Sequence, residues 1–354
     1  MRQLSRVAIE AVDRFLFQSC DPRLAPVVRI AYAFLLIIYT LVWMRDAELW
    51  FTDAGVLTSA TVQHMSDGQQ WSLLFLLPST AGVIETCLSL LLLHSVLLLL
   101  GCWSRVQIAC IFLWLVSFQH RNPMICDGED TVFRWFAFLM IFMPLDCGWS
   151  LTRRWSRSPF RPATTADAWA LRLMQIEVTL IYASTAWNKL QGATWQNGTA
   201  LYYVSHMTDH FGRVPVPWLL VDSLWIVKGL TWSVLAIESL LPLALWWRPT
   251  RRIAVVVGIG LHLGIEATMH LFLFEWIMIV GLLSFVRLPM RGALELKDPS
   301  EDAKNLAQSR QKNDSLGTEY LTAMCGVSTS TPPLCNDSTP AMTMPEVSSV
   351  RSSG

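Results

Sequence analysis

The stretch IAVVVGIGLHLGIEATMHLFLFEWIMIVGLLSFV, residues 253–286, decides the fold class of this chain because it is almost entirely apolar over 34 residues. A continuous α-helix of that length would extend about 51 Å, whereas the hydrocarbon core of a bilayer is about 30 Å thick. The tract is therefore too long for one membrane span. We predict a tight hairpin of two helices that turns near His270.

Apolar blocks of membrane-spanning length also fill the chain before this tract. Hydrophobic residues make up 53% of the sequence and charged residues only 15%, and short polar connections separate the blocks. This pattern predicts an all-α, polytopic helical membrane protein with about eight transmembrane helices, whose main partner is the lipid bilayer. The six further predicted spans are residues 27–44, 80–100, 106–118, 132–145, 168–187 and 230–247.

Three regions follow from the pattern. Residues 1–26 form an N-terminal segment in which 7–17 are predicted to be an amphipathic helix lying on the membrane surface. Residues 27–294 form the transmembrane domain. Residues 295–354 are rich in Ser, Thr, Pro and Asn and lack apolar periodicity, so we expect a disordered tail.

Arginines predict the orientation, because basic residues accumulate in short cytoplasmic loops. Every second connection is basic, which places both termini in the cytoplasm. The total of 27 basic and 27 acidic residues argues against a nucleic-acid partner. The arginines assigned to the inner side are Arg2, Arg6, Arg14, Arg23, Arg105, Arg153, Arg154, Arg157, Arg161, Arg248, Arg251 and Arg252.

Ionisable residues within apolar spans are the places to look for function, because burying them in a membrane is costly. His262, Glu266 and His270 repeat at intervals of four and would share one helix face, as a proton relay or part of a metal site. Alternatively, His270 belongs to the turn and Glu266 pairs with a nearby basic residue. We assign no metal site. Gly260 and Gly264 flank His262 at a spacing that would let another helix approach closely.

Three further carboxylate or amine groups lie in other apolar blocks. Glu177 lies near the middle of the fifth predicted span, which closes with Asn188 and Lys189, and Glu238 lies in the sixth. Taken alone, Lys189 is an ordinary interfacial anchor. We expect Glu238, His262 and Glu266 to face one another or a shared polar interior, because a charge at mid-membrane costs at least about 2.5 kcal/mol.

Several short motifs, in a fixed order over about residues 15–286, carry a resemblance to the HTTM family. These are bacterial proteins similar to the transmembrane half of vitamin K-dependent gamma-glutamyl carboxylase. The motifs are Asp21-Pro22, Trp50-Phe51 with Gly55-Val56-Leu57, Arg121-Asn122-Pro123 with Asp127-Gly128-Glu129-Asp130, Asn188-Lys189-Leu190 with Trp195 and Gly198, Glu238 with Pro242, and His262 with Phe274 and Met278.

The resemblance implies that Lys189 is a base that deprotonates a quinol, either reduced vitamin K or menaquinol, within the bilayer. An amine at the lipid boundary with few acidic neighbours suits that task, because desolvation favours its neutral form. The candidate catalytic residues are Lys189, His262 and Glu238, and the candidate cofactor-binding residues are Asn188, Trp195 and Glu177.

Two of the departures from the carboxylase bear most on function. The carboxylase has two adjacent lysines where this chain has Asn188-Lys189, and we expect no large substrate-binding domain after residue 286. Two other hypotheses therefore stand beside a carboxylase-like enzyme. One is a non-catalytic membrane partner in the maturation of, or immunity to, a secreted peptide. The other is an ion or proton transporter, although the two halves show no clear repeat.

Overall fold

The computed structural model describes residues 2–17, 24–156, 168–207, 212–213 and 222–286, all within the first of two units of the chain, Met1–Pro289. This part of the chain is helical, and its β-structure is limited to an isolated bridge between Gly212 and Met269. The all-α prediction is therefore confirmed. The predicted disordered tail, 295–354, lies outside the described residues.

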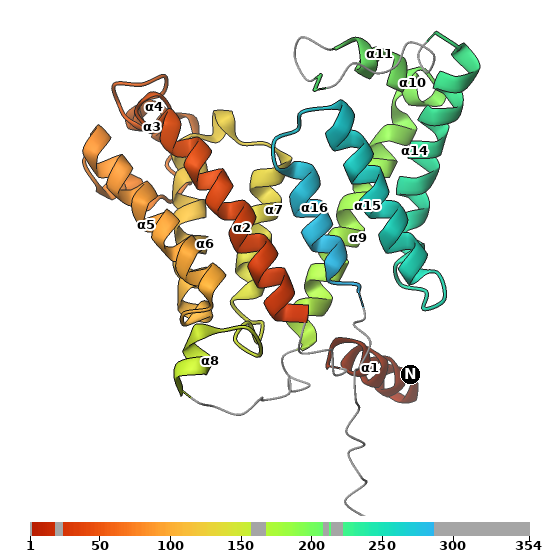
Figure 1. Ribbon diagram of the computed structural model, residues 1–354, viewed down its shortest axis with the longest axis horizontal. Coiled ribbons are helices and arrows are strands. Elements are labelled where there is room, and N and C mark those ends of the chain that lie inside the picture. The colour runs from red at the N-terminus through yellow and green to blue at the C-terminus, as the bar shows by residue number, and fades with distance from the viewer. Residues whose placement is uncertain (1, 18–23, 157–167, 208–211, 214–221, 287–354) are drawn as a thin grey trace, which may run out of the picture. The chain divides into compact units, whose positions relative to one another are not determined.

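Each predicted apolar span corresponds to a helix (Figure 1). The tract 253–286 is two helices joined by a turn that contains His270, as predicted. The helices are α2 (Leu24–Arg45), α5 (Ala81–Leu100), α6 (Ser104–Arg121), α7 (Gly128–Met140), α9 (Ala168–Gln191), α14 (Leu224–Ala244), α15 (Arg251–Thr268) and α16 (Phe274–Leu283).

The two largest differences from the expected boundaries are in α7 and α14. Helix α7 ends at Met140 and not at 145, since Pro144 cannot donate a backbone hydrogen bond and the chain before it forms tight turns. Helix α14 begins six residues before the predicted start at 230, and it includes Pro242 in its last turn. Apolarity alone locates these helices but does not fix where they end.

Three of the described helices, α2, α5 and α14, are long and apolar enough to cross a membrane. The others are shorter or less apolar: α9, for example, contains Arg172, Glu177 and Lys189. The presence of membrane-type helices agrees with the prediction, whereas the number of eight spans stays a prediction.

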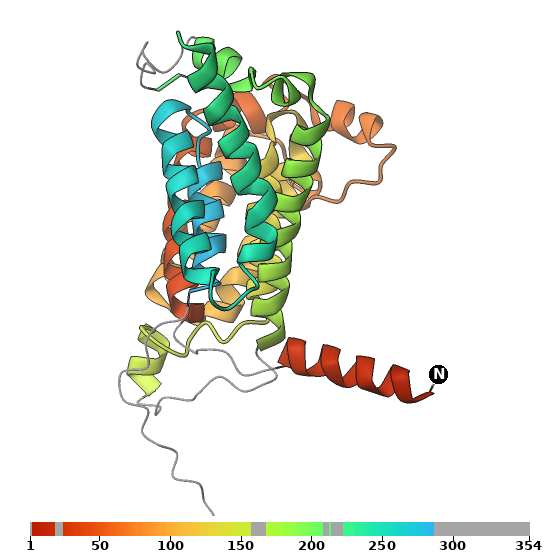
Figure 2. The ribbon, with the colours of Figure 1, turned by 90° about the vertical axis from the view of Figure 1, so that its right-hand side faces the viewer.

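The helices run roughly alongside one another and their connections gather at two ends (Figures 1 and 2). Helix α2 packs against α5 and α16, α9 packs against α14, and α15 packs against α16. One end carries α8 (Leu151–Ser156) and the α14–α15 connection. The opposite end carries the short helices α3 (Ala47–Phe51), α4 (Ser59–Met65), α10 (Ala193–Gln196) and α11 (Ala200–His206). The connections with Arg153 and Arg251 thus share an end.

Close helix packing depends on glycines other than the expected pair. A Cβ atom at Gly260 or Gly264 would meet nothing within 4 Å, so the expectation of a close approach there is wrong. At Gly281 in α16, by contrast, a Cβ atom would lie 2.7 Å from Val178 in α9 and 3.0 Å from Phe136 in α7. Gly281 is therefore where three helices meet.

Two arginines are completely buried in the bundle. Arg29 in α2 donates to the carbonyl oxygens of Leu145 at 3.0 Å and Trp149 at 2.7 Å. Arg121 at the end of α6 pairs with Asp53 at 3.0 Å. Each guanidinium therefore fastens a helix to a connection at one end of the bundle, which is a structural role for a costly charge.

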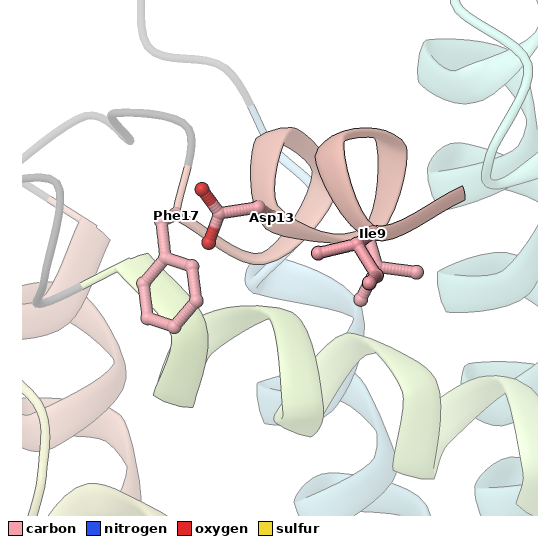
Figure 3. Close-up of a pocket in the computed structure, with 4 residues that line it drawn as sticks. Ile9, Asp13 and Phe17 are labelled. Atoms are coloured by element: carbon pink, nitrogen blue, oxygen red, sulfur yellow. The ribbon is translucent and has the colours of Figure 1, made fainter. Parts of the chain in front are cut away.

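Helix α1 (Arg2–Phe17) confirms that the N-terminal segment is helical. Phe15 packs on Trp246 with ring centroids 5.2 Å apart, and the guanidinium of Arg172 lies 5.6 Å from the Phe15 ring. Elsewhere α1 exposes apolar side chains around a shallow hollow of about 300 Å³ (Figure 3). The hollow is lined by Ile9, Val12, Asp13 and Phe17.

Candidate functional site

Lys189 and Glu238 form an ion pair between α9 and α14. The Lys189 Nζ atom donates to both carboxylate oxygens of Glu238, at 2.5 Å from Oε2. The Glu238 side chain is 7% exposed and the Lys189 side chain 25% exposed. The carboxylate is thus buried in the bundle, whereas the amine reaches it from a partly open side.

The connection after α9 folds back over this pair. The indole of Trp195, in α10, lies 4.9 Å from Lys189 Nζ, a cation–π contact. Gly198 has a positive φ of 74°, and a Cβ atom there would lie 2.8 Å from the Lys228 side chain in α14. A glycine therefore allows this connection to lie tightly against α14, next to Lys189.

His262 has a polar partner on each ring nitrogen. Its Nε2 atom lies 2.5 Å from the Tyr182 hydroxyl of α9, and its Nδ1 atom bonds to Glu275 of α16. All three residues are buried, with Tyr182 3%, His262 4% and Glu275 1% exposed. His262 therefore faces the protein interior, as the sequence predicts.

Glu266 and His270 meet the same arginine outside α15. The Nη1 atom of Arg213 lies 2.5 Å from Glu266 Oε1, and its Nη2 atom donates to His270 Nδ1 at 2.7 Å. Helix α15 ends at Thr268, so His270 belongs to the turn. Two arrangements were possible for His262, Glu266 and His270, and the structure has the one in which His270 belongs to the turn and Glu266 pairs with a basic residue.

The remaining candidates lie apart from the Lys189–Glu238 pair. Glu177 precedes Lys189 by twelve residues, about 18 Å along α9, and its buried Oε2 atom has no hydrogen-bond partner among the described residues. Asn188 is exposed near the end of α9. The structure thus groups Lys189, Glu238 and Trp195, and places His262 in an adjacent cluster.

The structure changes one premise of the lysine-base hypothesis. An amine with few acidic neighbours was expected at Lys189, but a buried carboxylate, Glu238, contacts it directly. The expectation of few acidic neighbours is therefore wrong. The sequence does not reveal this contact, because Lys189 and Glu238 are 49 positions apart and meet only when α9 and α14 pack together. Any role of Lys189 must therefore include Glu238.

The sequence did not single out Tyr182, Glu275 or Arg213 as site residues. Tyr182 and Glu275 bond to His262, whereas Arg213 contacts Glu266 and His270. Tyr182 precedes Lys189 by seven residues, which puts both side chains on one face of α9. That spacing was a usable signal. Arg213 lies in a polar connection, where no sequence pattern marks it as a site residue. No group of three or more potential metal-binding side chains occurs within the described ranges.

Comparison with known proteins places the chain in a family. The HTTM domain model matches residues 17–288, which is most of the chain and includes every residue of the site. A region of 193 residues is 26% identical to the sporulation-delaying protein SdpB of Bacillus subtilis (strain 168). It covers 51% of this chain and 58% of that relative. No solved structure matches the chain.

Proposed function

The chain belongs to the HTTM domain family, and we propose that it is a multi-pass membrane protein that binds a quinol at the Lys189–Glu238 pair and accepts a proton from it. The observation that carries the proposal is the pair itself: an amine that is open on one side and a buried carboxylate behind it.

The residues present fit a hydroquinone in their chemistry. A quinol hydroxyl both donates and accepts hydrogen bonds, and the pair offers an amine donor and carboxylate acceptors. Trp195 adds an aromatic surface beside the amine. A bound quinol, either reduced vitamin K or menaquinol, would supply an acidic hydroxyl and a pair of electrons.

The pair can accept a proton although the Lys189 amine already donates to Glu238. When the proton of the Lys189 ammonium moves to Glu238, a neutral amine faces the open side and a neutral carboxyl group lies behind it. The amine can then take a proton from a ligand hydroxyl. Glu238 is the acceptor that makes Lys189 available as a base.

We also propose that the eight apolar helices all cross the bilayer with both termini in the cytoplasm. The basic connections with Arg153 and Arg251 lie at one end of the bundle, which supports a common side for them. Exposed tryptophans, including Trp103, Trp149 and Trp247 at that end, are typical of a membrane interface.

Replacing Lys189 by Arg tests the proposal. Arginine keeps the positive charge and can pair with Glu238, but it does not release a proton at physiological pH. With a vitamin K-type hydroquinone, dissolved dioxygen as the oxidant and the full-length protein in lipid nanodiscs, we expect the rate of quinol oxidation, which follows deprotonation of the quinol, to fall on the order of a hundredfold or more. Lys228→Arg is the matched control. Full activity of Lys189→Arg would make this lysine a structural anchor.

A second candidate function is a non-catalytic membrane role in the maturation of, or immunity to, a secreted peptide. Two observations favour it: both oxygens of Glu238 already hold the Lys189 amine, as in a structural ion pair, and the chain is similar to a sporulation-delaying protein. The docking surface would be the connections 46–71 and 189–217. Under this function Lys189→Arg keeps its phenotype, whereas substitutions in those connections do not.

A further inference from the structure

Helix α1 is attached to the end of the bundle that carries the basic connections, and it runs across the direction of α9 and α14 (Figure 2). Phe15 makes the attachment, because its ring packs on Trp246 and the guanidinium of Arg172 lies 5.6 Å from it. The Trp246 indole also donates to the Thr179 hydroxyl of α9 at 2.9 Å. The last turn of α1 is therefore held by α9 and by the connection that follows α14.

The apolar side chains of α1 before this attachment are exposed. Ile9 is 66% exposed and Val12 58% exposed, and both line the shallow hollow shown in Figure 3. Val12 lies three residues before Phe15 and three after Ile9, so these side chains follow one side of the helix. Glu10 lies on the other side. An amphipathic helix with a bare apolar side is stable beside an apolar phase.

The surroundings of α1 indicate that this apolar phase is a lipid bilayer. Large tryptophan side chains, each at least 66% exposed, lie at the same end of the bundle, and tryptophans of this kind are typical of a membrane interface. A helix that runs across the spans at this level lies in the plane of the interface, where its apolar side meets acyl chains. The tryptophans are Trp103, Trp149, Trp155 and Trp247.

The charges at this end favour an anionic bilayer surface. Four arginines of α1, α8 and the connection between α14 and α15 are exposed there, and the exposed carboxylates of α1, Glu10 and Asp13, are fewer. Basic side chains beside a membrane attract anionic headgroups. The exposed arginines are Arg14, Arg154, Arg248 and Arg252.

We propose that α1 docks on anionic phospholipid, with Ile9 and Val12 among the acyl chains and the exposed arginines at the headgroups. An acyl chain that lies over the hollow covers both apolar side chains. This inference goes beyond the proposed function, because it requires no quinol. Only the name of the leaflet, the cytoplasmic one, rests on the orientation proposed above.

Photolabelling from the lipid tests this contact. Full-length protein is placed, one copy per disc, in phosphatidylglycerol nanodiscs with a trace of phospholipid that carries a diazirine in its acyl chain. Single-copy discs exclude a second copy of the chain as the cover of α1. Cleavage after arginine releases residues 7–14, which include Ile9 and Val12, and residues 30–45 of α2, which serve as the reference. We expect label on both peptides.

The lipid dependence tests the role of charge. In phosphatidylcholine nanodiscs, the label on residues 7–14, relative to the reference peptide, should fall roughly fivefold, because the arginines lose their attraction to the surface. Equal labelling in the two lipids would refute the preference for anionic lipid. Both leaflets of a nanodisc have the same composition, so the result does not depend on the orientation of the protein.

Substitutions test the apolar side. The double variant Ile9→Glu with Val12→Glu should lose label on residues 7–14 by on the order of tenfold or more, because carboxylates replace the inserted side chains. Glu10→Gln, on the other side of α1, is the matched control and should keep its label. Full labelling of the double variant would overturn the proposal. An unlabelled 7–14 peptide from wild-type protein, with the reference labelled, would also overturn it, and this result requires no variant. Either outcome leaves the Lys189→Arg test unaffected.

Discussion

At the scale of single residues, the sequence predicted which polar groups are buried better than it predicted their partners. Glu238 and His262 stand out because a carboxylate and an imidazole interrupt apolar blocks, and both are buried. Their partners, Lys189 and Glu275, come from other helices. No local sequence pattern indicates which faces of α9, α14, α15 and α16 meet. These pairings could therefore not be predicted from the sequence.

The Lys189–Glu238 pair should be asymmetric in its effect on stability. Lys189→Met leaves a buried carboxylate without its cation, and we expect a loss of about 3 kcal/mol, the lower end for breaking a buried ion pair. Glu238→Gln should cost less, because the partly exposed Lys189 amine can still donate to the amide oxygen or reach the interface. Thermal unfolding in a mild detergent measures both.

The double variant Lys189→Met with Glu238→Gln separates the energy of the ion pair from the effects of each single substitution on its surroundings. It removes both charges, so it should be more stable than Lys189→Met alone. Lys228→Met, at a lysine whose amine lies 5.9 Å from the Trp225 ring, is the matched control and should change stability little. Equal losses in the two single variants would contradict the asymmetry.

At the scale of elements, hydropathy located every apolar helix and the turn at His270, because lipid-facing and core positions are both apolar. Hydropathy could not place the end of α7, which Pro144 determines because it cannot continue the helical hydrogen bonds, or the start of α14. Glycine spacing was also insufficient. Whether a glycine is needed depends on what lies opposite it, and at Gly260 nothing does.

Gly281→Ala should destabilise the bundle where α7, α9 and α16 meet. The added methyl group would overlap Val178 and Phe136, whose side chains are buried, and we expect a loss of about 1–3 kcal/mol. Gly260→Ala is the matched control, because its methyl group has open space and alanine favours helix by up to about 1 kcal/mol. Equal melting temperatures for the two variants would rule out the packing described for Gly281.

The connection between α3 and α4 should loosen in acid. Asp53 accepts hydrogen bonds from the Ser59 backbone amide at 2.7 Å and the Ser59 hydroxyl at 2.8 Å, and from Arg121. These contacts, chiefly the Ser59 amide, lower the pKa of Asp53. Its carboxylate therefore stabilises the folded connection above the unfolded-state value of about 3.9, and this contribution is lost as the pH falls through the lower folded-state pKa.

Hydrogen exchange at the Ser59 amide measures this effect. After correction for the intrinsic exchange rate, the amide should be protected near neutral pH and lose protection in strong acid. In Asp53→Asn, protection should no longer depend on pH. Protection that is the same at both pH values in the wild-type protein would show that Asp53 does not hold the connection.

At the scale of the whole molecule, the proposed orientation rests on basic connections that share one end of the bundle. A reporter enzyme fused after Arg291 should be active on the cytoplasmic side, because eight crossings return the chain to the side where it began. A reporter inserted between α3 and α4 should be active on the opposite side. An external signal from the fusion after Arg291 would mean an odd number of spans.

Binding of a quinol from the bilayer at the Lys189–Glu238 pair can be tested by mass spectrometry of the lipophilic molecules that copurify with full-length protein in a mild detergent. We expect a menaquinone-like species with the wild-type protein, and its depletion in Lys189→Met but not in Lys228→Met. A wild-type extract without any quinone, from a folded protein and a quinone-containing membrane, would contradict it.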